Sequence, residues 1–304
     1  MKRVGYLWKH FCSEQNAITA IYRGTENKRS DRVVRRLFGY GDNSAATCGD
    51  LDPEKVAAYA RRLVAKLEAG KWFHRRGTKK TIISGSKVRD IEIAVLEDHF
   101  VQWMAILTIE DYFMKRMYRY SVGNLPKRGI EYARKTVERW VRSEDCKYFV
   151  KLDIRHFYKM VDLDKLSAML HRQIKDDRFM KILDACVYSA AVLDDDGTQR
   201  NLAIGYYTSP WFANIYLTQL DRFVTEQLYK TRRGKRVHYV KHYLRNVDDQ
   251  LYFGTSKSDL KKAVHAVIAY CRDELGIEIK PCWEICKIGE LLPADERGKK
   301  KLKP

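Results

Sequence analysis

The chain has 304 residues and a formal net charge of +19, because 58 lysines and arginines outnumber 39 aspartates and glutamates. This excess indicates a polyanionic partner, and the 12% aromatic content favours nucleic acid over an anionic lipid surface. No run of eighteen apolar residues occurs, and no apolar stretch follows Met1. We therefore expect no membrane span, no signal peptide and, by default, a cytoplasmic location. The seven cysteines complete no zinc spacing, which favours free thiols.

The first ninety residues predict helices followed by a hairpin. Residues 1–38 are helical and basic in character, and residues 39–49 are rich in turn formers. Asp52-Pro53 is a typical helix start, with apolar residues on one face up to Gly70. Residues 71–91 then predict two strands around a Gly-Ser turn. Basic residues beside such a turn can clamp a triphosphate, or they can be the charged edge of a solvated hairpin.

The middle of the chain predicts a strand that ends in an acidic residue. Tyr148–Asp153 alternates with period two, which places Phe149, Lys151 and Asp153 on one face. An amphipathic helix is expected at about residues 162–174. A carboxylate at a strand end can bind a cation if a second strand brings another carboxylate beside it.

A second segment, residues 203–217, predicts a turn that leads into a helix. Gly205 permits close backbone approach to a ligand, while Ser209 fits a helix N-cap and Pro210 the first helical position. Apolar residues recur at helical spacing from Phe212 to Leu228. We therefore expect one helix that packs along a sheet.

A third segment predicts a β-hairpin with two carboxylates at its tip. The arms are residues 237–244 and 250–253, both rich in β-branched and aromatic residues. Asn246-Val247-Asp248-Asp249 forms the tip, where the two aspartates would chelate Mg²⁺ against a substrate phosphate. Asp176-Asp177 and the aspartates at 194–196 are expected instead in solvated loops. After the hairpin we expect a helix at 258–275, a strand at 276–281 and a basic tail.

These three segments, in this order, resemble motifs A, B and C of reverse transcriptases. The resemblance runs from about Lys87 to Lys280 and is closest to the bacterial type of diversity-generating retroelements and group II intron-like elements. Two positions depart from the pattern. Asn246 replaces the usual tyrosine, and Ser209-Pro210 replaces the Ser-Gln of diversity-generating enzymes. The subfamily therefore stays open.

The resemblance implies an α+β fold, namely a right-hand polymerase palm with an antiparallel sheet and backing helices, plus helix-rich fingers. It divides the chain into an N-terminal helical region with the start of the fingers (1–84), a fingers–palm domain (85–290) and a basic tail (291–304). No segment before Pro304 resembles the family's primer-grip hairpin or helical thumb, so no thumb is apparent: either the chain is truncated, or the thumb is missing, or a partner supplies the grip on the duplex.

The resemblance also implies an RNA-templated DNA polymerase from a bacterial or phage retroelement. Such an enzyme adds dNTPs to a primer 3′-hydroxyl with two Mg²⁺ ions, for which Mn²⁺ can substitute. The implied partners are an RNA template, a DNA or RNA primer and dNTPs, with a non-coding RNA or accessory protein as optional additions. Two alternatives stay open. One is a maturase-like RNA-binding factor with weak polymerase activity, which Asn246 and the missing thumb favour; the other is a template-independent nucleotidyltransferase.

The resemblance assigns roles to individual residues. Asp153, Asp248 and Asp249 are expected to be catalytic and, with the backbone carbonyl of Ile154, to bind metal. Tyr158 is expected to be the steric gate that excludes a ribose 2′-hydroxyl, with a core aromatic as the alternative. Further nucleotide contacts are expected from Lys87, Arg89, Arg155, His156, Phe157, Gly205 and Ser209. Template or primer contacts are expected from Lys127, Arg128, Asn246 and Lys280, with a plain surface turn as the alternative for Lys127 and Arg128.

Overall fold

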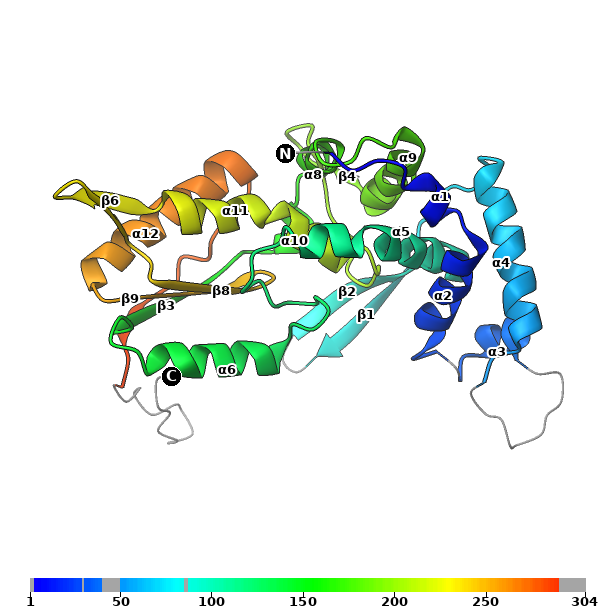
Figure 1. Ribbon diagram of the computed structural model, residues 1–304. Coiled ribbons are helices and arrows are strands. Elements are labelled where there is room, and N and C mark those ends of the chain that lie inside the picture. The colour runs from blue at the N-terminus through cyan, green and yellow to red at the C-terminus, as the bar shows by residue number, and fades with distance from the viewer. Residues whose placement is uncertain (1–2, 29, 40–49, 85–86, 290–304) are drawn as a thin grey trace. The chain divides into compact units, whose positions relative to one another are not determined.

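The protein is described here by a computed structural model that covers residues 3–28, 30–39, 50–84 and 87–289 (Figure 1). The chain forms two compact units, each built from separate stretches of sequence: Met1–Arg116 with Leu163–Phe212, and Met117–Asp162 with Ala213–Pro304. The domain boundaries predicted at residues 84 and 290 were taken from the family resemblance, and they stay a prediction. The predicted basic tail, the Gly-Ser turn and most of the 39–49 loop lie outside the described residues.

The first unit is mainly helical. Its helices are α1 (Trp8–Phe11), α2 (Glu14–Thr25), α3 (Arg32–Phe38), α4 (Pro53–Glu68), α5 (Leu96–Met114), α8 (Leu163–His171) and α9 (Asp177–Val187). The carboxylate of Asp52 caps α4 and accepts hydrogen bonds from the Glu54 and Lys55 amides, as the sequence predicted. Asp176 corrects a prediction, because it caps α9 instead of lying in a solvated loop. Helix α5 contacts α2 and α9 and has buried residues on several sides, so its sequence shows no single apolar stripe.

Two hairpins complete this unit. Strand β1 (Thr78–Ser84) pairs antiparallel with β2 (Lys87–Ile93), as predicted, and β4 (Val192–Leu193) pairs with β5 (Gln199–Arg200). The amide of Glu92 in β2 donates a hydrogen bond to the Ile204 carbonyl at 2.7 Å. The predicted turn before α10 (Ser209–Tyr216) is thus tied to the β1–β2 hairpin.

The second unit is built on a four-stranded antiparallel sheet with the strand order β10-β3-β9-β8. The strands are β10 (Ile285–Lys287), β3 (Tyr148–Asp153), β9 (Asp249–Gly254) and β8 (His242–Asn246). Strand β3 has the bounds that the sequence predicted. The helices of this unit are α6 (Ile130–Val141), α7 (Phe157–Met160), α11 (Thr218–Arg222) and α12 (Lys257–Tyr270), with π-helical turns η3 (Phe223–Gln227) and η4 (Cys271–Leu275). The mixed helices and antiparallel sheet confirm the predicted α+β class.

The two faces of this sheet differ in character. Helices α11 and α12 lie on one side of it and α6 lies on the other (Figure 1). Val150, Leu152 and Tyr252 are buried on the first face. On the opposite face Trp140 of α6 packs against Leu244 and Phe253, at one end of the strands. The other end of that face carries the acidic residues.

Three predicted elements were wrong in their bounds. The single arm at 237–244 is broken, because β7 (Lys235–His238) pairs with β6 (Tyr229–Arg232) through a two-residue turn. Both turn residues have positive φ, Arg233 at 50° and Gly234 at 74°, as a tight hairpin requires. The long helix to Leu228 is interrupted at Leu217 and ends in η3. Residues 276–281 form no strand, and only Ile279 makes a bridge, to Ile154.

Candidate active site

The antiparallel register brings the predicted carboxylates together. Asp153 of β3 lies opposite Asp249 of β9, and Asp249 lies opposite Asn246 of β8. Because opposite residues of antiparallel strands project from the same face, these three side chains form one row. Asp248 lies beside the row, in the two-residue turn that joins β8 and β9. The tight hairpin therefore delivers both of its carboxylates to the end of the strand that carries Asp153.

Two lysines neutralise part of this charge. The Nζ atom of Lys280 lies 2.7 Å from Asp153 Oδ2, and the Nζ atom of Lys151 lies 2.7 Å from Asp249 Oδ1. The hydrogen bond to Asp153 raises the pKa of Lys280, so the ammonium stays charged. Lys280 was expected at the template or primer; the structure pairs its ammonium with the Asp153 carboxylate.

The remaining oxygens fit a divalent cation. Asp153 Oδ1 is buried, and none of the residues that the structure describes donates a hydrogen bond to it. Burial raises the pKa of Asp248, and the negative charges of Asp249 and Asp153 raise it further. Hard carboxylate oxygens are the ligands that Mg²⁺ prefers, and a cation there would relieve this unfavourable negative charge. The donor set therefore suits Mg²⁺, although the three carboxylates do not all lie within 4.8 Å of one another.

The residues after Asp153 form a short turn into α7. Tyr158 is half-buried, and burial together with the charge of Asp248 raises its pKa to about 12. Its hydroxyl is therefore within electrostatic range of Asp248, and the steric-gate role stays a prediction. The side chain of Phe157 is buried, so only its backbone can meet a nucleotide. The Arg155 amide donates a hydrogen bond to the Glu278 carbonyl at 2.7 Å, and the nucleotide contact expected from Arg155 stays a prediction. The side chains of Arg155 and His156 are exposed.

The two basic residues of the predicted template loop differ in their surroundings. Lys127 is exposed and has a φ of 57°. The Arg128 guanidinium instead donates to the carbonyls of Tyr118 and Ser121, at 2.7 and 3.2 Å. Burial lowers the pKa of Arg128. Arg128 thus supports the backbone of its own loop, and the template contact predicted for Lys127 stays a prediction.

The predicted nucleotide contacts at Lys87, Arg89, Gly205 and Ser209 lie in the first unit. Gly205 has a φ of 114°, and a Cβ on it would stand 2.5 Å from the Glu92 carbonyl oxygen. The close approach expected for a ligand is therefore made to the protein's own strand β2. Ser209 is buried at the start of α10, whereas Arg89 is exposed on β2 and Lys87 is the first residue of that strand.

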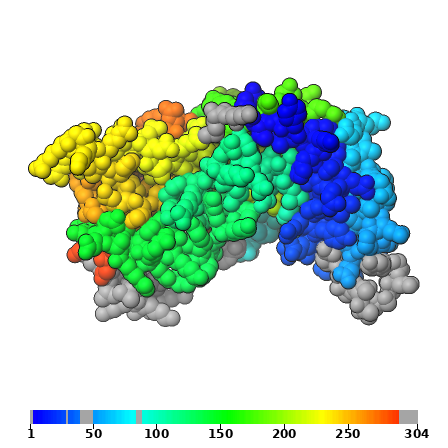
Figure 2. Space-filling view, in the orientation of Figure 1, coloured from blue at the N-terminus to red at the C-terminus, as the bar shows by residue number. Residues whose placement is uncertain are grey.

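Two features of the second unit were not predicted. The first is a buried ion pair between Arg245 of β8 and Asp221 of α11. The sequence signal for this pair was a charged residue next to the apolar positions of a strand. The second is the β6–β7 hairpin, where Arg232, Arg233 and Lys235 are exposed (yellow in Figures 1 and 2). The run Arg-Arg-Gly-Lys-Arg was the available signal for it.

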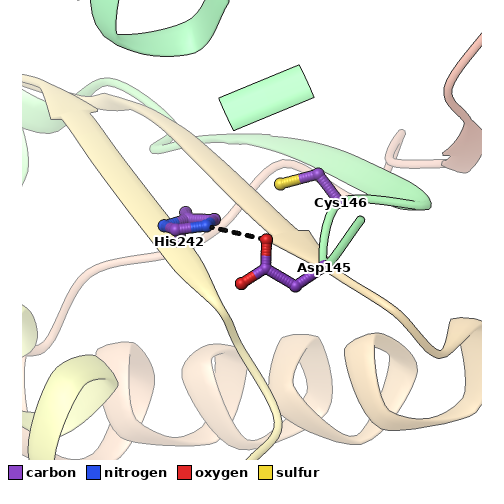
Figure 3. Close-up of side chains that lie close together, drawn as sticks. All are labelled: Asp145, Cys146 and His242. Atoms are coloured by element: carbon purple, nitrogen blue, oxygen red, sulfur yellow. Dashed lines mark hydrogen bonds and ion pairs between the residues drawn. The ribbon is translucent and has the colours of Figure 1, made fainter. Parts of the chain in front are cut away.

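One group of possible metal ligands lies apart from the carboxylates. Donor atoms of Asp145, Cys146 and His242 all lie within 4.8 Å of one another (Figure 3). The His242 ring stacks on Trp140, and its Nε2 lies 3.3 Å from an Asp145 oxygen that already accepts a hydrogen bond from Ser143. Burial raises the pKa of Cys146 to about 11, so this buried thiol is protonated in the metal-free protein. We interpret the group as a His–Asp pair beside a buried thiol.

Comparison with known proteins identifies the family. Residues 79–282, well over half of the chain, match the family described as reverse transcriptase (RNA-dependent DNA polymerase). The chain belongs to this family. The matched range includes all three motifs and both carboxylate-bearing strands.

The curated relatives include proteins encoded by introns. The group II intron-encoded protein LtrA of Lactococcus lactis is 23% identical over 257 residues, which cover 80% of this chain and 42% of LtrA. An uncharacterized 91 kDa protein in a cob intron of Schizosaccharomyces pombe is 28% identical over 171 residues, covering 52% of this chain and 21% of that protein. These relatives support the group II intron-like type. The chain spans less than half the length of the curated relatives that it matches.

Solved structures show the same fold at low sequence identity. Telomerase from Candida albicans, solved with a fragment of telomeric RNA, has a TM-score of 0.53 and 13% identity; the match covers 84% of this chain and 49% of that one. Apo telomerase from Candida tropicalis has a TM-score of 0.50 and 12% identity, covering 84% and 60%. These matches confirm the predicted palm-like fold. Among the described residues, no helix is long and apolar enough to cross a membrane.

Replacing Lys280 by methionine is expected to tighten Mg²⁺ binding by up to roughly fivefold. The ammonium and the cation compete for Asp153 Oδ2, and a partly exposed ion pair contributes about 0.2–1 kcal/mol. The measurement is the Mg²⁺ dissociation constant, obtained from the rise in Tm with Mg²⁺ concentration. Lys159→Met, an exposed lysine of α7, is the control. Unchanged Mg²⁺ binding in Lys280→Met would show that this ion pair does not compete with the metal.

Proposed function

We propose that this protein is an RNA-templated DNA polymerase that adds dNTPs to a primer 3′-hydroxyl with the help of two Mg²⁺ ions. The observation that carries the proposal is the row that contains Asp153 and Asp249, with Asp248 beside it, in a chain of the reverse transcriptase family. A convergence of carboxylates from separate strands is what metal-assisted phosphoryl transfer requires. The proposed origin is a bacterial or phage retroelement of the group II intron-like type.

The residues of the site have separate tasks in this reaction. Asp153 and Asp248 would hold the cations, with the Ile154 carbonyl completing the coordination and Asp249 as an outer ligand. Bound Mg²⁺ supplies a lowered pKa at the 3′-hydroxyl and neutralises charge on the triphosphate. Lys280, already paired with Asp153, can turn its ammonium towards the departing pyrophosphate. Tyr158, whose hydroxyl feels the charge of Asp248, would exclude a 2′-hydroxyl.

The proposed macromolecular partners are an RNA template and a DNA or RNA primer. The net charge of +19 supports a polyanion, and the relatives named above include a group II intron-encoded protein. Mn²⁺ is expected to substitute for Mg²⁺, because both are bound by carboxylate oxygens. A non-coding RNA or an accessory protein is a further candidate partner.

A second candidate function is RNA binding with little polymerase activity, as in a maturase-like factor. Asn246 favours it, because this exposed residue stands in the acidic row where the family usually has a tyrosine near the primer end. The intact donor set favours the polymerase, since an RNA-binding factor has no need of a buried carboxylate oxygen without a hydrogen-bond donor.

Primer extension separates these functions. The protein is incubated with Mg²⁺ and dNTPs, and the primer is annealed to RNA, annealed to DNA or left without a template. DNA synthesis that follows the RNA sequence supports the polymerase, while untemplated addition identifies a nucleotidyltransferase. RNA binding without synthesis, from wild type that is folded and binds Mg²⁺, supports the maturase-like function.

The β6–β7 hairpin is expected to contact the RNA backbone. The variant Arg232→Ser/Arg233→Ser should weaken RNA binding roughly tenfold at low salt and reduce the salt dependence of log K by roughly 1.4, because two phosphate contacts to single-stranded RNA are lost. The activity at saturating RNA should not change. The control is Arg172→Ser/Lys181→Ser, which removes two exposed charges from the first unit. Equal RNA affinity for both variants would remove the hairpin from the RNA-binding surface.

A further inference from the structure

The turn that carries Asp248 contains a strained residue. Val247 precedes Asp248 in the two-residue connection between β8 and β9, and its φ is 55°. A positive φ is costly for a β-branched residue, and hairpin turns of this length usually place glycine or asparagine there. The Val247 side chain is buried. Strain of this kind persists only where the surrounding structure holds it.

A buried guanidinium supplies part of that restraint. Arg245 is 0% exposed, and its Nη1 donates to the Val247 carbonyl at 3.2 Å. Its Nε and Nη2 donate to the two carboxylate oxygens of Asp221 at 2.8 and 2.7 Å. The same Nη1 also lies 3.0 Å from Asn214 Oδ1. The planar fork is thus anchored on α10 and α11 and directed at the residue before Asp248.

The loop before α6 packs against the turn and supplies a second restraint. Asn214 Nδ2 donates to the Gly123 carbonyl at 2.9 Å, which ties this loop to the same network. A Cβ on Gly123 would stand 2.5 Å from Asn246 Oδ1 and 2.7 Å from the Val247 amide nitrogen. The Val122 amide donates to the Arg245 carbonyl at 2.8 Å. The glycine therefore allows the loop to press on the turn that Arg245 holds.

Stability alone gives little reason for this ion pair. Replacing a buried ion pair by neutral residues of similar volume is often neutral or stabilising, because desolvation of the charges offsets their attraction. A guanidinium fork between a carboxylate and a carbonyl fixes direction as well as distance. The network is therefore better suited to positioning the turn than to stabilising the unit.

We propose that Arg245 is a positioning residue for the active site: anchored by Asp221 and Asn214, it holds the Val247 carbonyl and with it the strained turn that presents Asp248 to the metal. This inference rests on the proposed function for its catalytic consequence. Its structural consequence, a correctly placed metal ligand, is measurable without catalysis.

The test uses the variant Arg245→Met/Asp221→Asn, which removes the buried charges and keeps an acceptor for the Tyr243 hydroxyl. We expect kcat for primer extension to fall roughly 100-fold, because small misplacements at a reacting centre cost about this much. KM for dNTP, RNA affinity and Tm without metal should stay close to wild type. The Mg²⁺-dependent rise in Tm should need a higher Mg²⁺ concentration.

Tyr243→Phe is the matched control, since it removes a hydrogen bond to the same Asp221 without touching the Val247 carbonyl. Its kcat and Mg²⁺ response should match wild type. If the double variant does not fold, Arg245→Lys keeps the charge but not the fork and should show the same loss of kcat and of Mg²⁺ affinity. Folded variants with wild-type kcat and wild-type Mg²⁺ response would overturn the proposal.

The two inferences can fail separately. A wild-type protein that makes no DNA contradicts the proposed function, yet its Mg²⁺-dependent Tm still reports whether Arg245 places Asp248. A wild-type polymerase whose kcat and Mg²⁺ response do not depend on Arg245 leaves the proposed function intact and contradicts the positioning role.

Discussion

Asp248→Asn is expected to abolish RNA-templated DNA synthesis, lowering kcat on the order of 10³-fold. Metal-bound carboxylates contribute several kcal/mol to stabilisation of the transition state, and each 1.36 kcal/mol is a factor of about ten in rate. Asn keeps the size of the side chain and removes the charge that would hold the cation. Single-turnover extension of a primer on RNA measures the effect. Asp195→Asn, an exposed aspartate in the β4–β5 turn, is the control and should retain full activity.

The same substitution is expected to stabilise the protein in the absence of metal. Because the pKa of Asp248 is raised in the folded state, the folded protein binds more protons than the unfolded one between the ordinary and the raised pKa. The free energy of unfolding therefore falls as pH rises through that window. Above it the charged carboxylate of Asp248 destabilises the folded protein, and Asn removes this charge. Metal-free Asp248→Asn should unfold at a higher temperature than wild type at neutral pH, and Mg²⁺ should raise the Tm of wild type more than that of the variant.

This pairing of effects separates a catalytic loss from a folding defect. A variant that loses activity and also unfolds at a lower temperature without metal would contradict our account of Asp248. Retained activity in a stable variant would contradict the metal site itself. Thermal unfolding across pH, with and without Mg²⁺, distinguishes these outcomes.

Tyr158→Ala is expected to raise ribonucleotide incorporation relative to deoxynucleotides by roughly 10- to 200-fold, the range that one small group contributes in a shaped pocket. The Tyr158 hydroxyl is within electrostatic range of Asp248, one of the proposed metal ligands. The measurement is kcat/KM for CTP and dCTP in single-nucleotide extension opposite guanine.

Tyr158→Phe is the control for this experiment, because it keeps the ring and removes only the hydroxyl. Its sugar selectivity should equal that of wild type if the ring itself is the gate. Equal selectivity in wild type and Tyr158→Ala would leave Tyr158 as an ordinary core aromatic, the alternative that its half-buried position also allows.

Local sequence patterns predicted those elements whose structure depends on interactions between residues close in sequence. Period-two alternation predicted β3 with its observed bounds, and the Asp52-Pro53 start predicted α4, because side-chain alternation and capping act within a few residues. The carboxylates of motifs A and C were predicted for a related reason, since metal chemistry restricts the residue types that can serve. To lie in one row, these carboxylates then needed only that their two strands pair, and β3 and β9 do pair in the structure.

Predictions failed where several partners competed for one segment. Residues 237–244 read as one strand, yet Lys235–His238 pairs with β6, because a two-residue turn at Arg233 and Gly234 closes a local hairpin. The close neighbour of Gly205, the Glu92 carbonyl of β2, was not predicted, while the nucleotide contact at Gly205 stays a prediction. Neither neighbour lies within the pattern that was used for the prediction.

The sequence alone thus determined the fold class, the family resemblance and the carboxylates, because each is encoded by residue types at short spacing. Only the tertiary structure decided how those carboxylates are held. Arg245 looks like one more basic residue among 58, and its role follows from contacts with Asp221 and Asn214, which lie on helices elsewhere in the chain. A buried polar group must find partners wherever the fold places them, and no periodicity in one strand records where those partners are.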